Sequence, residues 1–157
     1  MAWPIDIIMD ISSEKFGEIF AVNPRNVREA LFSRLGIKAQ TRRIGLRTGK
    51  SADRVRALYD RLVTEAGKME RDLASELLRN WLFTQRAMLS DALNYFGIKH
   101  DNGLTDQEID FFEKLENEKV IELCKLLVPK HGKEPVSIYL RYLKVPGAVE
   151  AVAAVAS

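Results

Sequence analysis

Residues 69–96, MERDLASELLRNWLFTQRAMLSDALNYF, carry apolar side chains at every third or fourth position, which is the spacing of an amphipathic α-helix. On a helical wheel these side chains form one continuous arc: Leu73, Leu77, Leu78, Trp81, Leu82, Met88, Leu89, Ala92, Leu93 and Phe96. The arc is wider than a helix with a single buried side needs, so we expect neighbours on several sides. Gln85 falls inside the arc and would need a hydrogen-bond partner if it were buried. The stretch predicts one long central helix around which the chain packs.

Start and stop signals divide the remaining sequence into further helices. Gly97 can take a left-handed conformation, and Ile98 can then fold back on the last turn, which should end the central helix. Upstream we expect Ser12 or Ser13 to cap one short helix, and Asn23-Pro24 to start another. Ser51 should cap a third helix with a buried stripe, whose members are Val55, Leu58, Tyr59, Leu62 and Val63.

The C-terminal half has a turn followed by a strong start signal. Asp101-Asn102-Gly103 predicts the turn, and Thr105 to Glu108 form a capping box for a helix containing Ile109, Phe112 and Leu115. A second helix is expected from about Asn117 to Leu127. A third is expected near residues 136–142, because IELCKLLVP at 121–129 and IYLRYLKVP at 138–146 share a pattern.

The two ends of the chain are less regular. Residues 4–11, PIDIIMDI, alternate roughly and are interpreted as an N-terminal arm over residues 1–11, with a short helix as the alternative. The Ala/Val-rich residues 146–157 are interpreted as a frayed helix or a loosely attached tail. Together the signals predict an all-α, single-domain bundle of about seven helices over residues 1–157.

Composition indicates a soluble globular protein. The chain of 157 residues has 46% hydrophobic and 29% charged residues, with a net charge of +2. One cysteine, Cys124, excludes an intrachain disulfide framework and fits a reducing compartment. No basic N-terminal leader and no long apolar run are visible, so we expect a cytoplasmic protein that does not associate with a membrane.

Charge is distributed unevenly along the chain. Residues 21–60 hold ten basic residues against three acidic ones, whereas residues 91–157 hold eight against eleven. A basic segment of this kind is typical of a surface that meets nucleic acid or an acidic partner.

Within the basic segment, RRIGLRTGKSADRVRAL at residues 42–58 has an aliphatic residue, a small residue and a turn glycine at Ile44, Gly45 and Gly49. This pattern resembles the helix-turn-helix of bacterial repressors. The resemblance implies that the second helix enters the major groove of duplex DNA, as a dimer on two half-sites. It also assigns roles to eight residues: Ser51, Asp53 and Arg56 would face bases, and Arg42, Arg43, Arg47, Lys50 and Arg54 would neutralise phosphates.

The resemblance covers less than a fifth of the chain and has two departures. Lys50 stands where an aliphatic residue is usual, and Asp53 places an acid on the reading face. A second and commoner origin of such a pattern is a pair of bundle helices that meet at a glycine turn, with solvated arginines.

Other motifs fail on their spacing. GLRTGKS at 45–51 has three residues between its glycines, where a phosphate-binding loop needs four. The two histidines, His100 and His131, lack a second ligand at metal spacing, and no two acids are fixed as an acid–base pair. We therefore expect no enzyme, no metal and no cofactor. The sequence favours either a DNA-binding protein or a helical adaptor that meets an acidic protein, a second copy of the chain included.

Overall fold

A computed structural model describes residues 3–34, 51–65, 69–105 and 109–156, and all its regular elements in these ranges are helical. The all-α prediction is confirmed for these residues. They contain nine α-helices and one 3₁₀-helix, more than the seven or so expected. The chain divides into two compact units, Met1–Thr84 and Gln85–Ser157. The prediction of a single domain stays a prediction.

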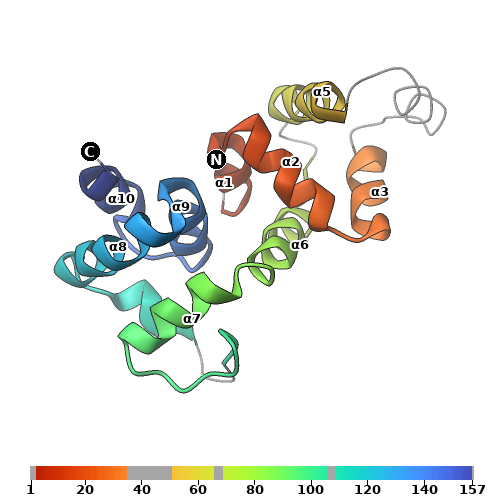
Figure 1. Cartoon of the computed structure of the whole chain (residues 1–157). Coiled ribbons are helices and arrows are strands. Elements are labelled where there is room, and N and C mark those ends of the chain that lie inside the picture. The colour runs from red at the N-terminus through yellow and green to blue at the C-terminus, as the bar shows by residue number, and fades with distance from the viewer. Residues whose placement is uncertain (1–2, 35–50, 66–68, 106–108, 157) are drawn as a thin grey trace. The chain divides into compact units, whose positions relative to one another are not determined.

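The first unit contains α1 (Ile5–Asp10), α2 (Ser13–Val22), α3 (Arg25–Arg34), α5 (Ser51–Thr64) and α6 (Arg71–Leu82). Helix α6 packs against α1, α2 and α3, while α5 packs against α2 (Figure 1). The largest fully buried side chains of this unit come from every one of these helices: Ile7, Ile8, Phe16, Ile19, Leu31, Leu62, Leu77, Leu78 and Trp81. A wide apolar arc on α6 was expected to have several neighbours, and it has them.

The second unit contains α7 (Arg86–Tyr95), the 3₁₀-helix η2 (Ile109–Lys114), α8 (Asn117–His131), α9 (Lys133–Tyr142) and α10 (Ala148–Ala156). Helix α8 packs against α7, α9 and α10, and α10 also packs against α9. Edge-to-face and tilted ring contacts connect the end of α7 through η2 to α9, and they join Phe96, Phe111, Phe112 and Tyr139. Phe112 is completely enclosed in this cluster.

The prediction of one helix from 69 to 96 is wrong, because the chain leaves the helix at Leu82 and starts α7 at Arg86. The cause is visible at Thr84. Its backbone N–H and its hydroxyl both donate to the carbonyl oxygen of Trp81, at 2.9 and 2.6 Å. In a continuous helix that carbonyl would accept from the N–H of Gln85. The two hydrogen bonds from Thr84 take the place of this helical hydrogen bond. Gln85 becomes the N-cap position of α7.

Both ends of the chain are more ordered than expected. The segment interpreted as an N-terminal arm forms the short helix α1. Its neighbouring residues Ile7 and Ile8 are both buried, whereas an alternating strand would bury only one of the two. The loose tail is α10, which buries Ala148, Ala151 and Val152 against its neighbours.

Several local predictions are confirmed. The hydroxyl of Ser12 accepts from the N–H of Lys15 at 3.1 Å and caps α2. Gly97 has a φ of 68°, and the N–H of Ile98 donates to the carbonyl of Leu93 at 2.9 Å, which ends α7. Asp101 and Leu104 exchange two backbone hydrogen bonds around the expected turn.

The predicted capping box lies partly outside the described residues, which omit 106–108. The helix that follows is a 3₁₀-helix rather than an α-helix. Helices α8 and α9 form where helices were expected.

Asn23 has a different role from the predicted cap of α3. It ends α2, is only 3% exposed, and is the one buried polar or charged residue among those the structure describes. Its amide Nδ2 donates to the carbonyls of Ile19 at 2.6 Å and Leu77 at 3.1 Å. Its Oδ1 accepts from Nδ2 of Asn80 at 2.9 Å. The side chain therefore joins the α2–α3 corner to α6.

Replacing Asn23 with alanine should lower the free energy of unfolding of the first unit by about 1–3 kcal/mol, because buried hydrogen-bonding groups lose their partner. Urea unfolding followed by the fluorescence of the buried Trp81 measures this loss. Asn26→Ala is the matched control, since Asn26 is exposed on α3. Equal midpoints for the two variants would contradict the role given to Asn23.

Two glycines of the second unit allow a paired test. Gly97→Ala should lower the free energy of unfolding by about 1–2 kcal/mol. The whole loss comes from the left-handed backbone conformation, because a Cβ there would meet no other atom. Gly103→Ala should cost more, because its φ is 89° and a Cβ would lie 2.8 Å from that of Leu89. Thermal unfolding by circular dichroism should show the larger fall in midpoint for Gly103→Ala. The reverse order would show that the turn does not pack against α7 as described.

Candidate functional site

The predicted nucleic-acid-binding residues fall mostly outside the part that the structure describes. Residues 35–50, with Arg42, Arg43, Arg47 and Lys50, are outside it, so their positions stay predictions. Helix α5 begins at Ser51, where the second helix of the motif was expected to begin. The side chains of residues 51–55, those of Ser51 and Arg54 included, are also outside the description. Arg56 is the predicted contact whose side chain can be placed.

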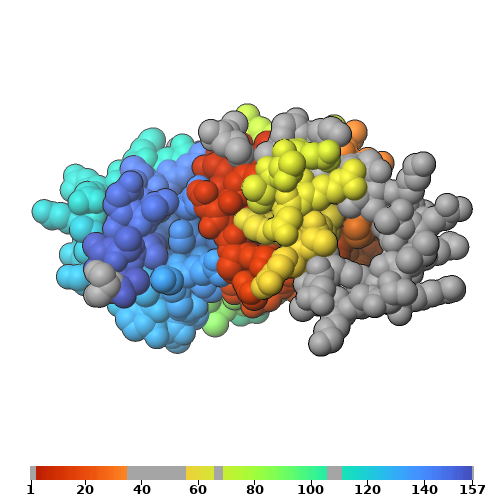
Figure 2. All heavy atoms as spheres, turned by 90° about the horizontal axis from the view of Figure 1, so that it is seen from above, coloured from red at the N-terminus to blue at the C-terminus, as the bar shows by residue number. Residues whose placement is uncertain are grey.

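Helix α5 has one buried side and one exposed side. Leu58, Tyr59 and Leu62 are buried, as expected, but Val63 is 45% exposed and was wrongly placed in the stripe. The ring of Tyr59 lies 5.1 Å from that of Phe16 on α2. Figure 2 shows the outer side of α5 at the surface beside α2. The helix is thus available along one side, which a groove-binding helix requires.

Tyr59 attaches α5 to the corner between α1 and α2. Its hydroxyl lies 2.9, 3.2 and 2.6 Å from the carbonyl oxygens of Ile8, Met9 and Ile11, and can donate to one of them at a time. These carbonyls lie at and beyond the end of α1, where helical carbonyls lack partners within the helix. The position of α5 is fixed by this polar contact as well as by apolar packing.

The exposed side of α5 carries both signs of charge. Arg56 and Arg61 are basic, whereas Asp60 is acidic, and the half-buried Glu65 follows directly after the helix. The side chain of Arg56 is 64% exposed, and its guanidinium lies 3.4 Å from a carboxylate oxygen of Glu14 on α2. Arg61 lies 3.5 Å from Glu65, one turn along the chain. The C-terminal part of α5 alone is therefore not a uniformly basic face.

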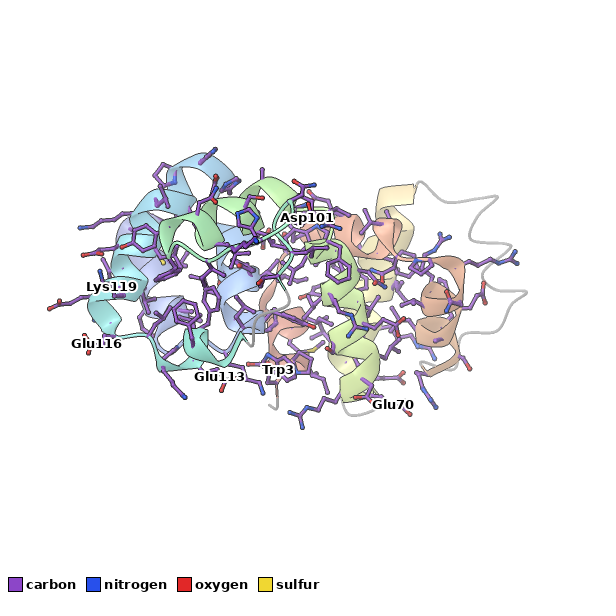
Figure 3. The ribbon with its side chains drawn as sticks, turned by 90° about the horizontal axis from the view of Figure 1, so that it is seen from below. Trp3, Glu70, Asp101, Glu113, Glu116 and Lys119 are labelled. Carbon is purple, nitrogen blue, oxygen red and sulfur yellow. The ribbon has the colours of Figure 1, made fainter. Side chains whose placement is uncertain are left out.

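Helix α3 contributes a cation that the motif analysis did not include. Arg34, at the end of α3, lies 2.8 Å from a carboxylate oxygen of Glu70, and both side chains are about half exposed. Glu70 is the residue before the first turn of α6, and Figure 3 shows it at that end of the helix. The charge run over residues 21–60 already included Arg34, so charge counting could have identified it where the motif could not.

A second polar cluster lies in the other unit. Asp91 on α7 accepts from Nζ of Lys130 at 2.9 Å, and the same oxygen lies 2.7 Å from Nε2 of His131. Both basic residues are in the last turn of α8, where cations interact favourably with the helix carbonyl end. The cluster fixes α7 to α8. The side chain of His131 is only 14% exposed.

The remaining candidate groups are accounted for by packing. His100 accepts from the N–H of Gly103 at Nδ1, at 2.9 Å, so its Nε2–H donates to Asn94 at 2.7 Å. Cys124 is buried, and burial raises the pKa of its thiol to about 11. Glu113 and Glu116 are exposed and point away from the ribbon in Figure 3, in agreement with a solvated acidic face.

Across the described ranges, no three His, Cys, Asp or Glu side chains are grouped to hold a metal ion. In the same residues, no helix has both the length and the apolar character for a membrane span. Phe83, at the end of α6, is 43% exposed and is one of several exposed apolar side chains.

Comparison with known protein families, curated proteins and solved structures finds no match to this chain.

Asp91 gives a pH dependence to the second unit. Hydrogen bonds from Lys130 and then His131 lower the pKa of Asp91 from its ordinary value of 3.8. A lowered pKa in the folded state stabilises the fold above the unfolded pKa, and this stability is lost as pH falls through the folded value. Asp91→Asn should therefore lower the free energy of unfolding by about 1 kcal/mol at pH 5 and by clearly less near pH 3.

Urea unfolding at the two pH values, followed by circular dichroism, measures this difference. Glu113→Gln removes an exposed carboxylate of the same unit and is the control, with little effect expected at either pH. An Asp91→Asn effect that is the same at both pH values would show that the carboxylate charge is not what holds α7 to α8.

Proposed function

We propose that this chain is a helical binding module that holds duplex DNA through the cations of residues 21–60, with the segment 42–58 as its main contact. The observation that carries the proposal is the one-sided burial of α5. Its buried residues Leu58, Tyr59 and Leu62 lie on the side that packs on α2, and its opposite side is exposed from Arg56 onward. In the sequence, residues 21–60, which include most of α5, hold ten basic and three acidic residues. Neutralising phosphates with such a run supplies most of the affinity for any DNA sequence.

Under this proposal the residues have separate roles. The phosphates are neutralised by five cations: Arg42, Arg43, Arg47, Lys50 and Arg54. Two further residues lie nearer the nucleobases: Ser51 and Arg56. A single half-site gives little specificity, so the proposal includes a homodimer on two half-sites. Binding, and not catalysis, is the activity proposed.

A second candidate function is an adaptor for an acidic protein. Its support is that two of the described arginines, Arg34 and Arg56, already pair with carboxylates of the chain itself. Carboxylate and phosphate are bound by the same guanidinium geometry, so the two candidates must be separated by experiment.

Titration of a labelled mixed-sequence DNA duplex at several salt concentrations tests the first proposal. The logarithm of the binding constant should fall linearly with the logarithm of salt, by about 0.9 for each phosphate contact. Arg42→Ala with Arg43→Ala and Arg47→Ala should weaken binding and flatten that slope, because three cations are lost.

The matched control replaces three exposed lysines of the second unit, Lys99, Lys125 and Lys133, and should alter binding less. Equal losses for the two triple variants would show that only net charge matters. Binding of an acidic polypeptide such as polyglutamate, without binding of the duplex, would overturn the DNA proposal in favour of the adaptor.

A further inference from the structure

Two arginines of the basic run are held by carboxylates that come from other helices. Arg56 on α5 pairs with Glu14, which lies in the first turn of α2 and 42 residues earlier in the chain. Arg34 on α3 pairs with Glu70, next to α6. Neither pair is a local contact within one helix, so each depends on how the first unit folds.

Both pairs lie at the surface. The side chains of Arg56 and Glu14 are 64% and 73% exposed, and those of Arg34 and Glu70 are 52% and 53% exposed. Ion pairs between exposed side chains contribute little stability, because water screens them and long side chains must be ordered. Such a pair can separate without disturbing the core.

The acid of the first pair is charged in the neutral range. The pKa of Glu14 is lowered, chiefly by a hydrogen bond from backbone and further by Ser13 and the Arg56 guanidinium. Its Oε1 lies 3.4 Å from Nη2 of Arg56, a position that a phosphate oxygen could equally take. A phosphate and the carboxylate would compete for the same N–H donors.

We propose that Arg56 contacts a phosphate rather than a base edge, as Arg34 does, and that Glu14 and Glu70 occupy these two phosphate-binding positions in the free protein until bound DNA displaces them. This inference rests on the function proposed above and adds the two acids as elements that weaken binding. Before each arginine binds a phosphate, its ion pair with the carboxylate must break. The free energy needed to break this pair offsets part of the attraction between arginine and phosphate. Removing the negative charge of either acid should strengthen binding.

The test compares Glu14→Gln with Glu18→Gln by titration of the same labelled duplex. Both variants remove one exposed acid from α2, but Glu18 pairs with Lys15 of its own helix, at 2.7 Å. Lys15 is 14% exposed and lies 5.6 Å from the centre of the Trp81 ring, so it is poorly placed for a phosphate. Glu14→Gln should tighten binding about two- to fivefold more than Glu18→Gln.

A double-mutant cycle makes the test specific to the pair. In an Arg56→Gln background the gain from Glu14→Gln should disappear, and Glu70→Gln should show the same dependence on Arg34. The salt dependence should also become steeper in the two Gln variants, by up to about 0.9 for each released arginine.

The outcomes separate this inference from the proposed function. If the unmodified protein binds the duplex but Glu14→Gln and Glu18→Gln are equal, or the cycle is additive, the competition is wrong and DNA binding stands. If the unmodified protein does not bind the duplex at any salt concentration, both proposals are wrong.

Discussion

The first unit depends on the buried amide of Asn23. An amide in an apolar core must make its hydrogen bonds, or the cost of removing it from water is not recovered. Asn23 makes them to the last turn of its own helix and to α6, so one side chain sets where α2 ends and which way α3 leaves. Helix α3 then packs on α6. Helix α5 packs on α2, which itself packs on α6. The two described helices of the basic region, α3 and α5, are thus both positioned by the same small core.

Local chemistry in the sequence predicted much of the fold. Ser12, Gly97 with Ile98, and the Asp101–Leu104 turn act through hydrogen bonds to residues within six positions, so sequence alone identifies them. The break in the central helix was missed because Thr84 competes for one carbonyl without any glycine or proline to mark it. Gln85, the polar residue in an otherwise apolar arc, was the available signal. Asn23 was misassigned because its decisive partner, Leu77, lies 54 residues away.

The candidate site was predictable in charge but not in geometry. Counting bases over residues 21–60 identifies the region, and helical spacing identifies the inner side of α5. Neither shows which acids face the arginines, because Glu14 and Glu70 reach Arg56 and Arg34 only through tertiary packing. The exposed side of α5 therefore combines attraction for an anion with internal competition for it.

We propose that the first unit turns apolar residues inward on α2 and α6 and presents the cations of residues 21–60 to DNA. Amide NMR spectra of the labelled protein, recorded while duplex DNA is added, test this claim most directly. The account predicts shifts concentrated in residues 25–64, with the amides of residues 85–156 unchanged. Shifts confined to residues 85–156, or none at saturating duplex, would contradict it.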